Sequence, residues 1–477
     1  MDIQNLKPTR ERDEPIYLQL YRRYCEAIAA GKLKAGDRVP SVRSLASELN
    51  LARGTVEAAY QMLVGEGYFV ARGAAGTVVS PRLARLAEPA GPRTVPPRAP
   101  DANSPQGAPG QALPFQLGLP ALDAFPRKTW ARLAGHTLRT LAAAAMTYPD
   151  PAGHEPLRRS IATYLGISRG IDCAPEQVFV TAGYHGALEL VRRVLLRDGD
   201  LGWYEDPGYA LARRFLLRAG LRLAPVPVDA EGLDVAHGLR RAPDARFAVV
   251  TPTHQSPMGM AMSLPRRLEL LEWARASRAW IVEDDYDSEF RYHGRPLPAL
   301  KSLDRHGRVL YTGTFSKVLL PGLRLAYLVV PAAQVARMRE LVDLLPGPGS
   351  ILPQATVADF MEQGHFARHL RKMRALYAER RGWLVDALAR ELGDRISIQP
   401  QAGGIHVLAR LAAGHDDRAL AAAAQARGLG LKALGDWRVG RSSRGGLLMG
   451  FTNFGTPDVA TAEVRRLRTI MDATWSA

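Results

Sequence analysis

The chain has 477 residues, which is too long for one domain, and we expect two or three. Its content of 47% hydrophobic and 7% aromatic residues describes an ordinary soluble globular protein. The net charge of +16 favours a polyanionic partner. Residues 1–80, however, hold 11 Lys and Arg against 9 Asp and Glu, so a compositional bias towards arginine explains the bulk charge equally well.

Cysteine usage and the N-terminus exclude several classes of protein. Cys25 and Cys173 lie far apart, without the spacing of a metal site or a disulfide framework, which favours a reducing cytoplasm. The opening Met-Asp-Ile-Gln-Asn lacks the basic and then apolar pattern of a secretion signal. No apolar run approaches the roughly 20 residues that cross a bilayer. We therefore expect a cytoplasmic protein with no membrane partner and no metal.

The N-terminal part of the chain has the pattern of a winged helix-turn-helix. Apolar residues at helical spacing predict a helix over residues 16–30, opened by a proline. A second helix is expected at Val42–Leu49, with Ser41 as its N-cap, and a third at Arg53–Gly65. Residues 68–79 then read as a strand, a glycine-rich tip and a second strand. This order predicts a DNA-binding domain.

In that geometry the start of the third helix enters the major groove. Arg53 and Thr55 lie there, and an arginine can donate two hydrogen bonds to a guanine edge. The hairpin tip at residues 72–76 can approach the DNA backbone closely because its glycines have no side chains. For each arginine taken singly, the alternative is an ordinary solvated side chain.

One block in this region carries a family resemblance. The run Leu-Ala-Ser-Glu-Leu-x-Leu-x-Arg-Gly-Thr-Val, preceded by Asp37-Arg-Val-Pro-Ser-Val-Arg43, closely resembles the GntR family of bacterial DNA-binding domains over roughly residues 13–80. The resemblance implies DNA contacts by Arg43, Arg53, Thr55 and Arg72 or Gly73. Ala52 departs from the pattern, since relatives usually have a hydroxyl residue there. A missing N-cap bond weakens the helix start by about 1 kcal/mol.

The next segment predicts a linker. Residues 81–112 include eight of the 34 prolines and show little apolar periodicity. Such a segment cannot bury a core and behaves as a semi-extended connection. We therefore place domain boundaries at 1–80, 81–112 and 113–477.

The remaining chain alternates helical patterns with short apolar strands. Helices are expected at residues 186–197 and 265–277, among others. The strand candidates are Val178–Thr181, Leu201–Tyr204, Phe247–Thr251, Trp280–Asp284, Val309–Thr312 and Leu325–Val330. This alternation predicts an α/β fold with a largely parallel sheet and functional residues at the strand ends.

One of these strand ends carries a lysine. Lys317 follows a run of hydroxyl residues, and Arg324 comes seven residues later behind a Pro-Gly turn. The hydroxyl residues are Thr312, Thr314 and Ser316. An amine that attacks an aldehyde needs a fixed electrophile, and hydroxyls beside a guanidinium suit a phosphate. An aldehyde that carries a phosphate suggests pyridoxal 5'-phosphate (PLP), whereas an exposed Lys and Arg beside a strand is the alternative.

Other strand ends supply matching groups. The loop over residues 181–187 joins a strand to a helix, whose N-terminal N–H groups can bind phosphate. Tyr209 follows a turn and could stack on a flat ring, although ordinary packing is the alternative. Asp284 could keep a pyridine nitrogen protonated, with Tyr286 on the same strand face beside the phenolic oxygen. Asp285 is the alternative acid, and an acidic strand end is by default a solvated loop.

In order and spacing, these residues resemble the fold-type-I aminotransferases over roughly residues 115–475. The resemblance implies a smaller α+β subdomain, a Schiff base of PLP on Lys317, and a homodimer with composite sites. It assigns the phosphate to Thr314, Ser316, Arg324 and the backbone of Gly183, Tyr184 and His185, and the ring to Tyr209, Ser256, Asp284 and Tyr286. The run Tyr148-Pro-Asp-Pro-Ala-Gly153 resembles the segment that sends a tyrosine to the neighbouring subunit's phosphate.

The complete architecture resembles the MocR/GabR family of PLP-dependent transcriptional regulators. The strings that carry it are Glu205-Asp-Pro-Gly-Tyr, Thr253-His-Gln-x-Pro-x-Gly259, Glu283-Asp-Asp-Tyr-Asp-Ser-Glu-Phe290 and Pro321-Gly-Leu-Arg-Leu325. Two departures from true aminotransferases bear on activity. Ser256 stands where the enzymes carry an Asn that touches the cofactor oxygen. The strand Gly446–Phe451 lacks the arginine that binds a substrate carboxylate, and Arg444 just before it is our candidate.

Three hypotheses follow from the sequence. The first is a regulator that binds double-stranded operator DNA and senses PLP, or an amino compound that reacts with PLP on Lys317. The second is a working PLP-dependent aminotransferase with an accessory DNA-binding domain. The third is a DNA-binding protein whose second domain has lost PLP. Because both departures favour binding over turnover, we expect the first.

Overall fold

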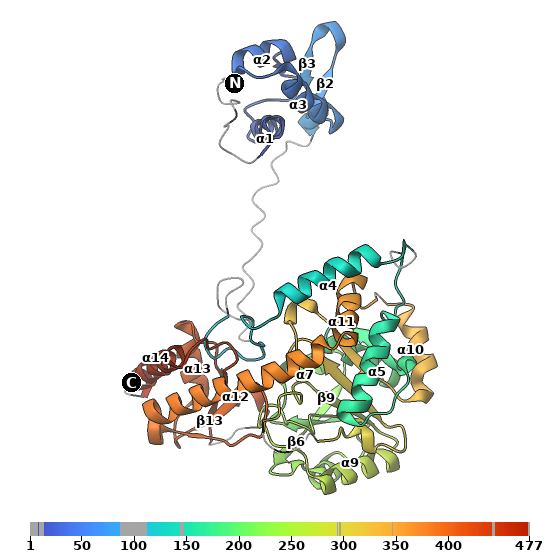
Figure 1. The fold of residues 1–477 in the computed structure, drawn as a ribbon, viewed down its shortest axis with the longest axis vertical. Coiled ribbons are helices and arrows are strands. Elements are labelled where there is room, and N and C mark those ends of the chain that lie inside the picture. The colour runs from blue at the N-terminus through green and yellow to red at the C-terminus, as the bar shows by residue number, and fades with distance from the viewer. Residues whose placement is uncertain are drawn as a thin grey trace. The chain divides into compact units, whose positions relative to one another are not determined.

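The computed structural model describes residues 8, 14–85, 112–143, 147–292, 294, 297–345, 347–440 and 444–475. The chain divides into two compact units, residues 1–101 and 102–477 (Figure 1). Most of the predicted linker over residues 81–112 lies outside the described residues. Among the described helices, none has the length and apolar character needed to pass through a bilayer.

The N-terminal unit is a winged helix-turn-helix, as predicted. Its elements are α1 (Ile16–Ala29), β1 (Arg38–Val39), α2 (Val42–Leu49), α3 (Arg53–Gly65), β2 (Phe69–Ala71) and β3 (Thr77–Val79). The sheet has the order β1-β3-β2, with antiparallel pairing throughout. Sequence reasoning missed β1 because two residues are too few to show an alternating pattern.

An aromatic cluster fixes the third helix against the rest of this unit. Tyr24 of α1, Tyr60 of α3 and Phe69 of β2 pack edge to face, with ring centroids 5.2 to 5.7 Å apart. The Tyr60 hydroxyl also donates to the carbonyl oxygen of Pro40 at 2.9 Å. Such pairs stabilise beyond their buried area, so they hold α3 at a defined angle to the wing.

The large unit is built on an eight-stranded sheet of order β4-β11-β10-β9-β8-β5-β6-β7. Its strands are β4 (Val178–Thr181), β5 (Leu201–Asp206), β6 (Arg222–Asp229), β7 (Gly232–Leu233), β8 (Phe247–Val250), β9 (Trp280–Asp285), β10 (Val309–Thr314) and β11 (Ala326–Val329). Neighbours from β10 to β6 pair in parallel, while β11 and β7 pair antiparallel. The predicted strands and the mostly parallel sheet are confirmed.

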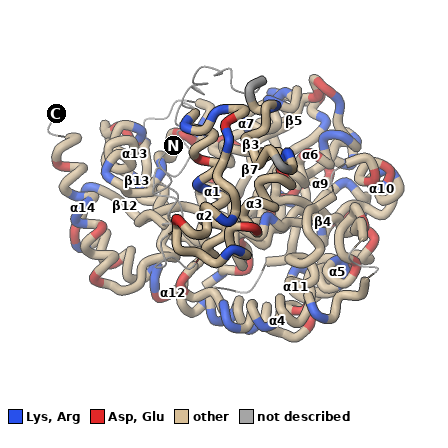
Figure 2. The backbone as a smooth tube through the Cα atoms, turned by 90° about the horizontal axis from the view of Figure 1, so that it is seen from above, with Lys and Arg blue, Asp and Glu red and all other residues tan. Residues whose placement is uncertain are grey.

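Helices cover this sheet, and their apolar faces form its core. They are α4 (Arg127–Thr140), α5 (Glu155–Arg169), α6 (Tyr184–Leu195), α7 (Ala210–Arg218), α8 (Val235–Arg241), α9 (Leu264–Ala276), α10 (Val335–Val342) and α11 (Ile351–Glu362). Figure 2 shows Lys and Arg interspersed with Asp and Glu along the tube. The bulk positive charge is therefore spread over the chain, and the candidate sites must rest on particular residues.

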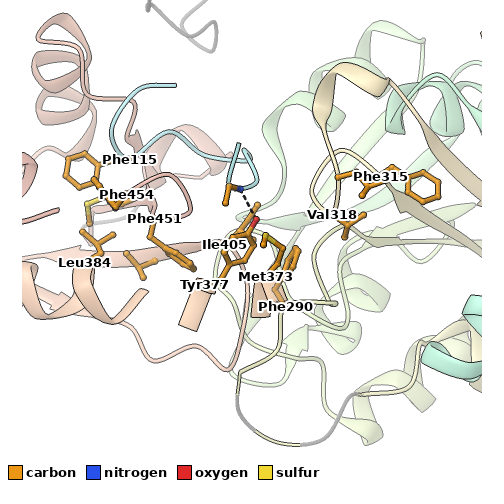
Figure 3. Close-up of a cluster of buried hydrophobic side chains, with 14 of the residues drawn as sticks. Phe115, Phe290, Phe315, Val318, Met373, Tyr377, Leu384, Ile405, Phe451 and Phe454 are labelled. Atoms are coloured by element: carbon orange, nitrogen blue, oxygen red, sulfur yellow. Dashed lines mark hydrogen bonds between the residues drawn. The ribbon is translucent and has the colours of Figure 1, made fainter. Parts of the chain in front are cut away.

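The smaller α+β subdomain is also present. Its four antiparallel strands follow the order β12-β13-β15-β14. Its elements are α12 (His365–Leu392), β12 (Ile396–Ile398), β13 (His406–Leu411), α13 (Asp417–Ala426), β14 (Lys432–Ala433), β15 (Gly446–Gly450) and α14 (Pro457–Trp475). One apolar cluster continues from this subdomain to the sheet through Tyr377 and Phe290 (Figure 3). The Tyr377 hydroxyl accepts a hydrogen bond from the Ala121 backbone N–H at 2.8 Å.

Candidate functional site

Lys317 follows β10 at the carboxyl edge of the parallel sheet. Its Nζ donates to the carbonyl oxygen of Gly118 at 2.8 Å. Burial lowers the pKa of the Lys317 amine, and the positive Arg324 lowers it further, while Asp287 and Asp284 raise it. The amine therefore loses its proton more readily than an exposed lysine does, as a nucleophile must.

Gly118 is required where it contacts this lysine. Its φ of +75° lies in the left-handed region, and a Cβ built on it would stand 2.6 Å from the Lys317 Nζ. A side chain here would be strained by the backbone angle and would displace the amine. This contact joins residues 199 positions apart, and no local pattern in the sequence reveals it.

An anion cradle lies beside the lysine. Gly183 is the N-cap of α6 and has a φ of +90°, and no side chain caps the N–H groups of this helix. The Arg324 guanidinium lies over it, with Nη2 donating to the Ala182 carbonyl oxygen at 3.3 Å. A Cβ on Gly183 would stand 2.9 Å from that Nη2. Thr314 faces the same edge, and its Oγ1 accepts from the Ser316 N–H at 3.1 Å. A helix N-terminus with an arginine suits a phosphate.

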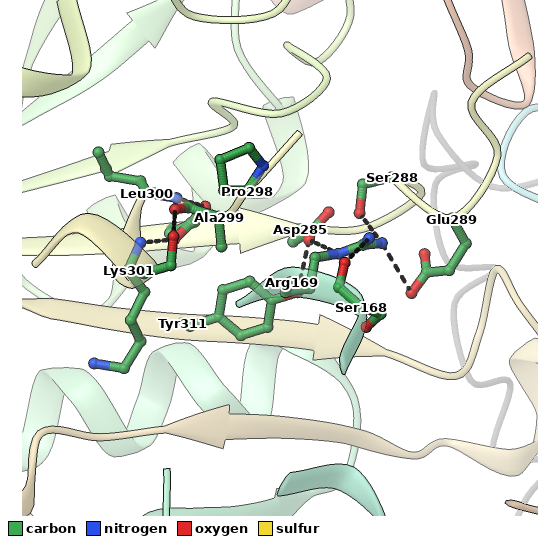
Figure 4. A network of polar contacts seen from close by, with 12 residues as sticks. Ser168, Arg169, Asp285, Ser288, Glu289, Pro298, Ala299, Leu300, Lys301 and Tyr311 are labelled. Atoms are coloured by element: carbon green, nitrogen blue, oxygen red, sulfur yellow. Dashed lines mark hydrogen bonds and ion pairs between the residues drawn. The ribbon is translucent and has the colours of Figure 1, made fainter. Parts of the chain in front are cut away.

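The two adjacent acids at the end of β9 have different surroundings. Asp284 is hydrogen-bonded to Tyr184, and burial raises its pKa to about 8. Asp285 points elsewhere, where its Oδ2 lies 2.9 Å from the Arg169 Nε and accepts from the Tyr311 hydroxyl at 2.6 Å (Figure 4). Because Asp285 is already paired with a buried cation, Asp284 is the acid that remains to meet a ligand.

A hydrogen-bonded group lies next to Asp284. The Tyr286 hydroxyl is 3.0 Å from the His254 Nδ1 and is also hydrogen-bonded to Ser256. The Ser256 N–H donates to the Thr251 Oγ1 at 2.9 Å, and the Thr251 hydroxyl donates to the buried Glu205 at 2.6 Å. The structure thus brings Tyr286 and Ser256 together, as their predicted roles require. It adds His254, which belongs to the same predicted motif as Ser256 but had no predicted role.

Aromatic residues close one side of the site. The ring of Tyr209 lies 6.4 Å from that of Tyr184 and 5.5 Å from that of Trp437. The ring of His185 packs 5.3 Å from that of Phe215, and burial followed by the nearby Arg324 charge lowers its pKa. Trp437 comes from the small subdomain and was not predicted, since it lies 228 residues after Tyr209 and belongs to no recognisable motif.

Two predicted site residues lie apart from this group. The side chain of Tyr148 is fully exposed. Arg444 is exposed just before β15; burial, followed by the charges of Arg438 and Arg444, lowers the pKa of Arg410. On β15, Leu448 is fully buried against Met258, Leu408 and Leu434, so an apolar group occupies this part of the strand.

The predicted DNA-contacting side chains of the N-terminal unit reach solvent. Arg43 on α2, Arg53 at the start of α3 and Arg72 at the wing are exposed, and Thr55 is half-buried. Gly73 begins the wing tip with a φ of +56°. Ser41 caps α2 as predicted, since its Oγ accepts from the Ser44 N–H at 3.1 Å.

Two families match the chain. The aminotransferase class I and II family matches residues 126–431, and the gntR family of bacterial regulatory proteins matches residues 16–79. A solved structure, the multiple substrate aminotransferase of Thermococcus profundus, superposes with a TM-score of 0.69 at 28% identity. The superposition covers 77% of this chain and 93% of that one.

Curated relatives cover both units. The probable rhizopine catabolism regulatory protein MocR of Rhizobium meliloti is 39% identical over 89% of this chain and 87% of its own length. The pyridoxine biosynthesis transcriptional regulator PdxR of Corynebacterium glutamicum is 33% identical over 91% of each chain. With a cradle for a phosphate, an acid for a ring nitrogen and a nucleophilic lysine in place, the residues fit PLP. The chain therefore belongs to the MocR-like family of PLP-dependent transcriptional regulators, in which a GntR-type winged helix is joined to an aminotransferase-like domain.

Proposed function

We propose that this regulator senses PLP itself, or an amino compound that reacts with PLP held by Lys317, and that its affinity for operator DNA changes in response. The lowered pKa of the Lys317 amine, beside the anion cradle, is the observation that carries the proposal. An effector shifts DNA binding only if it binds one arrangement of the protein better than the other. The proposed place of action is the cytoplasm.

The cofactor contacts follow from the site. Arg324, Thr314, Ser316 and the N-terminus of α6 at Gly183, Tyr184 and His185 would hold the phosphate. Asp284 would pair with the ring nitrogen, and Tyr286 and Ser256 would approach the ring oxygen. Tyr209 would cover the ring. When bound, the cofactor supplies an electron sink for amino compounds. Asp284 keeps its own negative charge once it faces a cation, which reverses the effect of burial on its pKa.

A homodimer completes this site. We propose that Tyr148, whose side chain is fully exposed, reaches the phosphate in the partner subunit. A large aromatic side chain in water gains free energy when a second surface covers it. Two winged helices per dimer would then read two half-sites of an operator.

The DNA contacts would come from three places on each winged helix. Arg53 and Thr55 would read base edges, because the start of the third helix enters the major groove in this fold. Arg43 would hold the phosphate backbone, together with Arg72 and Gly73 of the wing.

Arg444 would bind the carboxylate of an effector.

Borohydride reduction of the full-length protein tests the cofactor role. We expect the mass to rise by one reduced cofactor per chain and the label to map to Lys317. Lys317→Ala should take no label, whereas the exposed Lys372→Ala should be labelled like the parent. A label on another lysine, or none on the parent, would remove the basis of the proposal.

The second candidate is a working aminotransferase with an accessory DNA-binding domain. The aminotransferase fold favours it, while Ser256 and the apolar surroundings of Leu448 argue against it. Steady-state assays with amino donors and keto acids separate the two. Turnover of about 1 per second or more would favour the enzyme, and DNA footprints that change with PLP or an amino compound would favour the regulator.

A further inference from the structure

A cavity lies close to the cofactor residues but is lined by other side chains. Its volume is about 210 Å³. Its walls come from residues 253–254 and 259–261, residues 287–288 and 290–291 with Leu297, and residues 400 and 402–404. Lys317, Asp284, Tyr209 and Arg324 do not line it. Since water occupies about 30 Å³ per molecule in the liquid, this cavity has room for on the order of seven non-hydrogen atoms.

Four polar atoms at this cavity lack hydrogen-bond partners among the described residues. They are the Thr253 Oγ1, the His254 Nε2, the Asp287 Oδ2 and the Arg291 Nε. The first three residues are more than nine-tenths buried, with exposed fractions of 8%, 8% and 1%. A buried polar group left unpaired is destabilising, and native proteins rarely tolerate several together. The site is therefore built to receive a polar molecule.

The chemistry of the walls defines that molecule. The Asp287 Oδ1 lies 2.9 Å from the His254 Nδ1. A carboxylate only accepts hydrogen bonds, so Nδ1 donates to it, while the Nε2 on the other side of the ring has no partner among the described residues. The cavity thus offers an acceptor at Asp287, a cationic donor at Arg291, and polar atoms of His254 and Thr253 beside them. A ligand that satisfies all of them carries N–H donors at one end and a carboxylate at the other.

We propose that this cavity is a non-covalent binding site for a small zwitterion, an amino acid or a compound like one. It deepens the proposed function, because the amino compounds that would react at Lys317 belong to the same chemical class. The Tyr286 hydroxyl, 3.0 Å from the His254 Nδ1, connects the cavity to the predicted cofactor site. Occupancy of the cavity would change the hydrogen bonding of that tyrosine.

Calorimetric titration of the borohydride-reduced, full-length protein tests the site. The probe is N,N-dimethylglycine, a zwitterion whose tertiary amine cannot condense with an aldehyde, so capture at Lys317 plays no part. We expect one saturable site per chain. Glycine betaine has the same carboxylate but no N–H, and it should bind at least about tenfold more weakly.

Variants locate the site. Asp287→Asn should weaken binding of N,N-dimethylglycine by about tenfold or more. Ala261→Leu, which fills the cavity without touching a charge, should abolish it, while the exposed Arg305→Gln, outside the cavity lining, should bind like the parent. If Asp287→Asn does not fold, Ala261→Leu and the comparison with glycine betaine still test whether the probe binds in this cavity.

Two results would overturn the proposal. Absence of saturable binding up to about 50 mM would mean that water alone fills the cavity. Equal binding by the parent and Ala261→Leu would place the probe elsewhere. Failure of the proposed cofactor role is seen separately, because it appears as a parent protein that takes no borohydride label.

Discussion

The two units of this chain hold their charged residues in different ways. The arginines offered to DNA, such as Arg53 and Arg72, stand exposed on a small scaffold. Around Lys317, the lysine itself and the acids Asp284 and Asp285 are buried or half-buried, and each has a partner or a shifted pKa, while Arg324 is exposed. Replacing an exposed charge removes only the contacts of that charge. Removing the partner of a buried charge costs more free energy, because the remaining charge stays buried without compensation. Changes in the large unit should therefore have larger effects.

Arg169→Leu should have the largest effect. The Arg169 and Asp285 side chains are only 4% and 2% exposed, so Asp285 would remain buried without its cation. We expect the free energy of unfolding to fall by about 3–5 kcal/mol in chemical denaturation. The exposed Arg305→Leu is the matched control and should change it by less than about 0.5 kcal/mol. If the free energy of unfolding falls as little for Arg169→Leu as for the control, the expected difference between the two units is wrong.

Asp284→Asn should alter the pH dependence of stability. Burial raises the Asp284 pKa to about 8, while the unfolded carboxyl titrates near pH 4. Between these values the folded state keeps a proton that the unfolded state has released. Raising the pH through this window therefore lowers the free energy of unfolding of the cofactor-free protein.

The Asn variant has no such proton, so its stability should decline less with pH. At pH 8 it should exceed the parent by about 1–3 kcal/mol in thermal unfolding, while it retains PLP more weakly. A variant that follows the parent's pH profile would mean that Asp284 is ionised in the folded protein. Asp244→Asn is the control, because Asp244 is an exposed acid whose loss should leave the dependence of stability on pH unchanged.

Arg53→Ala tests the exposed half of the comparison. We expect operator affinity to fall by about 1–3 kcal/mol, with no change in the stability of the fold. Fluorescence anisotropy at one fixed salt concentration measures it. Arg22→Ala removes an equally charged side chain that is bonded to Glu14 on the same unit, and it should leave affinity close to the parent's. An unchanged DNA footprint for Arg53→Ala would mean that Arg53 does not contact the operator.

Ala52→Ser should have the smallest effect. Ala52 is the N-cap of α3 with extended backbone angles, and no side chain caps the helix there, as predicted. A serine hydroxyl should stabilise this start by about 1 kcal/mol. Slower amide exchange in the first turn of α3 would show it. Unaltered exchange would mean that the backbone N–H groups at this end are already satisfied.

Local patterns explain why much of the fold could be predicted. Helices α2 and α3 have the predicted bounds because their periodicity and their ends are encoded within a few residues. Strands such as β4, β8 and β11 are short apolar runs that are buried on both faces. Strand β6 was missed because Pro225 and Pro227 argue against a strand, although β6 lies beside the edge strand β7 in the structure.

The rest of the site depends on contacts between distant parts of the chain. Neighbouring acids at the end of β9 could not be told apart until Arg169, 116 residues away from Asp285, was found beside one of them. Trp437 against Tyr209 is equally non-local. Sequence motifs therefore indicate which residues form a site. The residues that change the charge state of those site residues are known only once the chain has folded.

The hydrogen bond between Lys317 and Gly118 has a mechanical consequence. A nitrogen that forms a covalent bond to another molecule has fewer protons to offer, so the Gly118 oxygen and any captured aldehyde compete for one atom. Gly118 follows closely on Phe115, whose carbonyl oxygen pairs with the Gly450 N–H of the small subdomain at 2.9 Å. Chemistry at the lysine would therefore change the contacts of residues 115–118, the stretch that joins the lysine's site to β15 of the small subdomain.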